Sequence, residues 1–90
     1  MTAAELVLPD DFADYGWEVE SKGVFWDAVV QRDNRRVPVT FYDPGRLAQD
    51  VNDELASEPQ FLLARVIVLP KVTLQEMQRS IADLPEEFFE

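Results

Sequence analysis

The stretch Arg36–Leu55, RVPVTFYDPGRLAQDVNDEL, decides the expected topology of this chain, because its periodicity changes in the middle. Up to Tyr42 apolar and other residues alternate, which is typical of a half-buried strand. Asp43 then suits the N-cap of a helix, and Pro44 suits the first helical position. The stretch therefore predicts a strand that passes directly into a helix.

The helix predicted after Asp43 has one apolar side and one acidic side. Its apolar residues fall at helical spacing and are Leu47, Ala48, Val51 and Leu55. Such a stripe predicts burial against the rest of the protein. The acidic side groups Asp50, Asp53 and Glu54, with Glu58 just beyond the helix. This acidic face is a candidate surface for a basic protein partner; the alternative is a polar face that only keeps the protein in solution.

A further strand and a further helix are expected downstream. Residues 61–69 are almost continuously apolar, which predicts a strand covered on both faces. A helical connection from the preceding strand makes these two strands parallel. The capping box Thr73–Glu76 predicts the second helix. Its apolar stripe consists of Leu74, Met77, Ile81 and Leu84.

Two more strands are expected upstream. Residues 17–20 alternate apolar and acidic side chains, and residues 24–31 are rich in β-branched and aromatic ones. Pro38 lacks an N–H for a ladder hydrogen bond, so the strand that contains it is expected at a sheet edge. The expected fold is α+β, β-β-β-α-β-α. It is an antiparallel three-strand meander plus one parallel strand in the order 3-2-1-4, with two helices packed on one face.

The chain is expected to form a single domain over residues 1–90, with an N-terminal arm at 1–16 and a short acidic tail at 85–90. Leu6–Leu8 is expected to be a small edge strand or a packed arm. Phe88 and Phe89 in the tail either dock on another molecule or fold back on the core. The chain shows no leader-like start and no apolar run of membrane length, so we expect a cytoplasmic protein.

The composition argues against most kinds of catalysis and against nucleic acid. The chain has no His and no Cys, which excludes Ser-His and Cys-His pairs and imidazole or thiolate zinc sites. Its net charge of −10 repels phosphate backbones. We therefore expect no nucleic-acid partner and no membrane, and no catalytic, cofactor-binding or metal-binding residues.

The expected layout resembles, in topology alone and over residues 17–84, the core of the ribonuclease H-like fold. Nucleases of that fold use acids from the first strand, the first helix and the end of the fourth strand. The first expected strand offers Glu18 and Glu20, but the fourth ends in Leu69-Pro70 without an acid. The carboxylate set is incomplete, so we expect that the protein is not an enzyme.

Two other groups are candidates for protein binding. Alternation along residues 24–31 places Trp26 on one face and Phe25, with Val29, on the other. Both faces are bulky and apolar, so one is left for the N-terminal arm, a second copy or another protein. Arg35 and Arg36 crowd a predicted hairpin tip, where they could hold a partner carboxylate or a phosphate.

These observations favour a non-catalytic, acidic protein-binding module. We expect an inhibitor of the immunity or antitoxin type that covers a basic protein partner. The alternative is a homo-oligomeric structural or accessory protein, in which the face with Phe25 and Val29 forms a two-fold interface.

Overall fold

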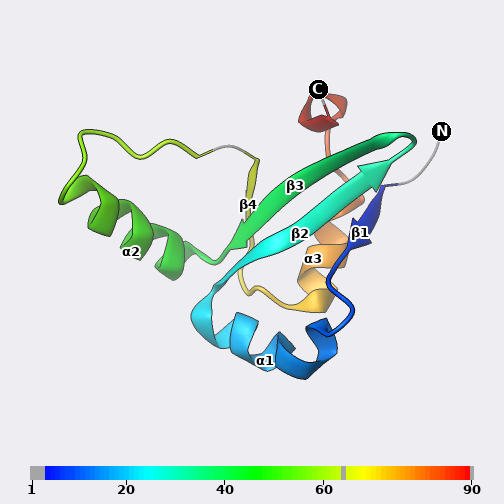
Figure 1. Cartoon of the computed structure of the whole chain (residues 1–90), viewed down its shortest axis with the longest axis horizontal. Coiled ribbons are helices and arrows are strands. Elements are labelled where there is room, and N and C mark those ends of the chain that lie inside the picture. The colour runs from blue at the N-terminus through cyan, green and yellow to red at the C-terminus, as the bar shows by residue number, and fades with distance from the viewer. Residues whose placement is uncertain (1–3, 64, 90) are drawn as a thin grey trace.

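The computed structural model describes residues 4–63 and 65–89, which form an α+β fold with one mixed sheet (Figure 1). The elements are β1 (Glu5–Val7), α1 (Phe12–Lys22), β2 (Val24–Arg32), β3 (Arg35–Tyr42), α2 (Pro44–Leu55), β4 (Val66–Val68), α3 (Leu74–Ile81) and the 3-10 helix η1 (Glu86–Phe89). Strand β2 pairs antiparallel with β1 and β3, whereas β3 and β4 are parallel. The α+β class and the parallel pair on either side of α2 confirm the prediction.

The predicted strand order 3-2-1-4 is wrong: the order is β1-β2-β3-β4. Residues 17–20 are helical and belong to α1, where Phe12 and Val19 are buried and Trp17 is 74% exposed. Four alternating residues are too few to separate a strand from an amphipathic helix. With this segment in a helix, β4 pairs with β3, and Leu6 in β1 packs against the core.

Pro38 lies in an interior strand, which also differs from the prediction. The N–H of Thr40 donates to the carbonyl of Arg65 at 3.2 Å, on the side of β3 that faces β4. Pro38, two residues earlier, presents its nitrogen to the same side, but β4 reaches only as far as Thr40. The proline therefore occupies the part of β3 where β4 offers no acceptor.

The core lies on one face of the sheet, beneath α1 and α3. Phe41, Met77, Val30 and Val72 are its most deeply buried large side chains. The stripe predicted for α3 is confirmed at Met77 and Ile81, while Leu74 at its first position is exposed. The side chain of Thr73 accepts from the N–H of Glu76 at 3.2 Å, which caps α3 as predicted.

The predicted burial of α2 is wrong, since no residue of this helix is buried. Figure 1 shows α2 and the segment after it extending to one side of the sheet. The predicted strand at 61–69 shrinks to β4, and Leu62 and Leu63 are exposed in the coil before it. Arg65 interrupts the extended backbone with a positive φ of 56°, so pairing starts only at Val66.

The predicted tail folds back on the sheet as η1, and Phe89 is buried. The guanidinium of Arg32 lies 4.1 Å from the centre of the Phe89 ring, and Arg35 donates to the Phe89 carbonyl. Arg65 donates to the Phe88 carbonyl from the other side. Within residues 4–63 and 65–89, no helix is long and apolar enough to cross a membrane.

Candidate functional site

Helices α1 and α3 pack on one face of the sheet, and the opposite face, called the outer face here, is apolar over much of its area and meets the start of α2 at Tyr42. Alternation and strand register place the following residues on it: Val7, Val24, Trp26, Val29, Pro38, Thr40, Tyr42, Val66 and Val68. In Figure 1 no helix crosses in front of β2 and β3, while α3 lies behind them. Trp26 is 56% exposed and Val68 is 47% exposed. The outer face is therefore open around Trp26 and Val68, whereas Val24 and Tyr42, at the end where α2 begins, are buried.

A β-bulge decides which aromatic residue of β2 reaches the outer face. Pairing with β3 shifts register between Phe25 and Ala28, so that Phe25 joins the core face together with Ala28 and Val30. Phe25 is only 4% exposed and packs edge-to-face on Phe12, with ring centroids 5.2 Å apart. The prediction that Phe25 shares an outward face with Val29 is wrong. Trp26 takes that place, and regular alternation gave no sign of the bulge.

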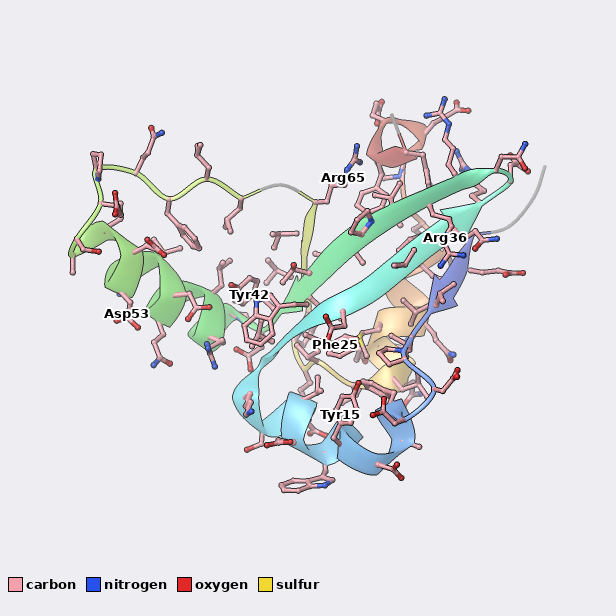
Figure 2. The ribbon with its side chains drawn as sticks, in the orientation of Figure 1. Tyr15, Phe25, Arg36, Tyr42, Asp53 and Arg65 are labelled. Atoms are coloured by element: carbon pink, nitrogen blue, oxygen red, sulfur yellow. The ribbon has the colours of Figure 1, made fainter. Side chains whose placement is uncertain are left out.

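Residues 44–63, called the arm from here on and distinct from the N-terminal arm predicted at residues 1–16, add further apolar side chains beside the sheet. Leu55 in α2 is exposed, and Leu62 is 79% exposed in the coil that follows. Phe61 and Tyr42 line a shallow depression of about 380 Å³ together with Asp50, Asp53, Glu54 and Ser57. The depression therefore lies between the arm and the outer face. Figure 2 shows Tyr42 at the point where α2 leaves the sheet.

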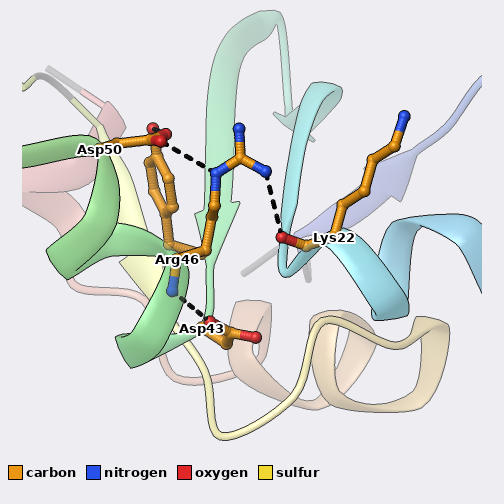
Figure 3. Close-up of polar contacts among 5 residues, drawn as sticks. Lys22, Asp43, Arg46 and Asp50 are labelled. Atoms are coloured by element: carbon orange, nitrogen blue, oxygen red, sulfur yellow. Dashed lines mark hydrogen bonds and ion pairs between the residues drawn. The ribbon is translucent and has the colours of Figure 1, made fainter. Parts of the chain in front are cut away.

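Polar contacts hold the first turns of α2 against the sheet (Figure 3). The Tyr42 hydroxyl donates to Asp50 at 2.8 Å, and Arg46 forms an ion pair with the same carboxylate at 2.9 Å. Arg46 also donates to the carbonyl of Lys22 at 3.3 Å, and its own N–H is capped by Asp43 at 2.7 Å. These contacts fix the start of the arm on the sheet. Residues 52–60, farther along the arm, are exposed to solvent.

The predicted acidic face divides into two parts. Asp50 is half-buried and is satisfied by Tyr42 and Arg46. Asp53, Glu54 and Glu58 are exposed, and none of the ion pairs found among the described residues includes them. Three of the four predicted carboxylates therefore remain available to a partner.

Arg35 and Arg36, predicted at a hairpin tip, do lie at the β2–β3 hairpin, but both bond within the chain. Arg35 bonds to the carbonyl of Phe89, and Arg36, although exposed, donates to the Gln31 side chain at 3.0 Å. Elsewhere Lys22 pairs with Glu18 at 3.3 Å, and Arg79 with Glu76 at 3.5 Å. Because most of these cations have partners within the chain and acidic residues outnumber basic ones by 18 to 8, carboxylates dominate the charge presented to other molecules.

Tyr42 carries a pKa raised from its ordinary value of 10.0, first because it is buried and then because it donates to Asp50. A raised pKa means that the folded state holds this proton more tightly than the unfolded state does. The resulting stabilisation is complete below pH 10 and is lost as the pH rises through 10 towards the folded-state pKa.

We therefore expect the free energy of unfolding to fall more steeply above about pH 10 in the native chain than in Tyr42→Phe. Urea unfolding of both proteins at about pH 8 and about pH 11 gives the loss of unfolding free energy between the two pH values for each protein. The comparison cancels the titration of lysines, which both chains share. Equal slopes would show that Tyr42 does not couple α2 to the sheet.

The described residues suggest no established kind of site. Within 4–63 and 65–89, no three acidic side chains are grouped so that they could hold a metal ion. Comparisons with protein-family models, curated proteins and solved structures found no match for this chain. The function is therefore argued from the outer face, the arm and the charge around them.

Proposed function

We propose that this chain is a non-catalytic module that acts by binding another protein. The observation that carries the proposal is its surface area of 6125 Å². A folded monomer of 10.3 kDa is expected to expose about 5,400 Å², roughly 700–800 Å² less. The chain therefore leaves more surface exposed than a compact domain of its mass does. The exposed outer face and arm are where apolar surface remains to be covered.

The charge supports a basic partner. The net charge is −10, and the exposed carboxylates Asp53, Glu54 and Glu58 lie along the arm. Such a surface steers a cationic protein during association and disfavours an anionic one. An inhibitor of the immunity or antitoxin type, which covers a basic enzyme or toxin, is the function that agrees best with this combination of charge and apolar area.

The salt dependence of association tests the proposal once a basic partner has been captured at low salt. We expect the association rate constant to fall by about tenfold or more between low and high ionic strength. Asp53→Asn/Glu54→Gln should lower the rate at low salt severalfold. Asp83→Asn/Glu87→Gln, which removes the same charge near the ends of α3 and η1, should change it much less. An association rate that ignores salt would count against the proposal.

A homo-oligomeric structural or accessory protein is the second candidate. The apolar outer face favours it, because a two-fold contact could cover this face on two copies at once. Sedimentation of the purified chain at micromolar concentrations distinguishes the two functions. A stable dimer favours the second candidate, whereas a monomer that binds a basic protein favours the first.

A further inference from the structure

We infer that the partner docks on one continuous surface formed by the outer face and the arm, and that it is a basic protein whose contact patch has an apolar centre ringed by Lys or Arg. This docking face is centred on Trp26 and Val68, which are exposed on the outer face, and the exposed arm residues Leu55 and Leu62 extend it. The inference rests on the proposed function and adds to it the location of the site and the chemistry of its occupant.

The shape of the molecule is the first argument. The chain measures 43 × 31 × 20 Å, and its thinnest dimension corresponds to one sheet with helices on a single side. Its radius of gyration is 13.7 Å, against about 12 Å for a compact domain of this length. Both values reflect an arm that meets the sheet at Tyr42 and leaves Leu55 and Leu62 exposed. A helix with an apolar stripe and no buried residue is stabilised when another surface covers it.

The distribution of charge gives the chemistry of the occupant. Asp27 is exposed directly beside Trp26, and Asp53, Glu54 and Glu58 lie along the arm. Arg46, which reaches Asp50 in the lining of the depression at Tyr42, is already paired with that carboxylate. An apolar centre with an acidic rim is complementary to an apolar patch with a cationic rim.

The same rim argues against a second copy as the occupant. A two-fold contact through this face would bring the carboxylates of Asp53 and Glu54 from both copies close to one another. Each chain also carries a net charge of −10. Like charges placed across an interface oppose association, and their effect increases as salt is lowered. A basic partner meets the same apolar area without this repulsion.

A synthetic amphipathic peptide of leucines and lysines serves as the probe for this face. The background is Trp17→Phe, which leaves Trp26 as the single tryptophan, so that its fluorescence reports on the docking face. We expect a blue shift on binding at low salt, and backbone amide shifts concentrated at Trp26, Leu55 and Val68. A matched peptide with glutamate for lysine should not bind.

Each tryptophan is replaced separately in the otherwise native chain, and the Trp17 variant is the matched control for the Trp26 variant. Trp26→Ala should weaken peptide binding about tenfold or more, because aromatic side chains at the centre of an interface dominate its energy. Trp17→Ala removes the same side chain from α1, which packs on the other face of the sheet, and should change the affinity less than about twofold. Circular dichroism checks that both variants keep the native helix content.

The outcomes separate this inference from the proposed function. Amide shifts confined to α3 and η1 would overturn the docking face and leave a protein-binding function in place. Equal binding of the lysine and glutamate peptides would overturn the basic chemistry. A stable dimer that buries Trp26 would overturn both the inference and the first proposed function. Failure of the lysine peptide to bind at low salt would also overturn the inference.

Discussion

Phe41→Ala should lower the free energy of unfolding by about 3–5 kcal/mol, enough to leave a domain of this size at the margin of stability. The ring of Phe41 is completely buried, and its strand neighbours in the sheet are Phe25 on β2 and Ile67 on β4. Met77 of α3 belongs to the same cluster. Removal of the ring opens a cavity at the one place where both strand pairs and α3 meet, and the main chain of a sheet cannot collapse to fill it. Urea unfolding followed by circular dichroism measures the loss.

Phe61→Ala is the matched control for this prediction. Phe61 is also a phenylalanine, but it is only half-buried in the coil after α2. We expect it to cost about 1 kcal/mol or less, since little of its surface is removed from water. A loss as large as that of Phe41→Ala would show that the arm packs against the domain in solution, and it would contradict the open arm on which the docking face depends.

Gly23→Ala should lower the free energy of unfolding by about 2 kcal/mol through two separate effects. Gly23 ends α1 with φ 74°, a conformation that costs an alanine roughly 1 kcal/mol. An added Cβ would also lie 2.6 Å from Cγ of Asp43, so the carboxylate must move. Because that carboxylate caps α2 at the N–H of Arg46, moving it costs about 1 kcal/mol more.

A double-mutant cycle separates the two effects. In an Asp43→Ala background the clash and the cap are both absent, so Gly23→Ala should cost only the backbone strain of about 1 kcal/mol. Gly45→Ala is the control in the first turn of α2, where the new Cβ would lie 3.7 Å from Asp43 in ordinary contact. It should be neutral or stabilise the protein by up to about 1 kcal/mol. Equal costs of Gly23→Ala with and without Asp43 would remove the cap from the explanation.

Local signals in the sequence predicted the parts of the fold that depend on a few neighbouring residues. Asp43-Pro44 does begin α2, Thr73 does cap α3, and Met77 and Ile81 do face the core. The helical crossover does make the strands around it parallel. The exposed carboxylates at the end of α2 were also predicted in this way, because helical spacing alone groups the acidic residues on one side of the helix.

The candidate site was predicted only in part, and the reason is that its key features are not local. The bulge that turns Trp26 outward and Phe25 inward arises from the pairing of β2 with β3. The engagement of Arg35 with η1 joins residues 54 positions apart. Neither contact leaves a periodic pattern within its own segment.

The sequence by itself determined the acidic character of this protein, the absence of His and Cys, and the caps at which α2 and α3 begin. It also supplied enough apolar residues for one small core. Tertiary structure alone decided which apolar residues that core would take. Periodicity shows that a strand or helix has an apolar face, but burial requires a second surface that meets it. For α3 that surface is the inner face of the sheet. For α2 and Trp26 it does not come from the described part of this chain, and so an apolar stripe that predicted a core became the candidate binding face.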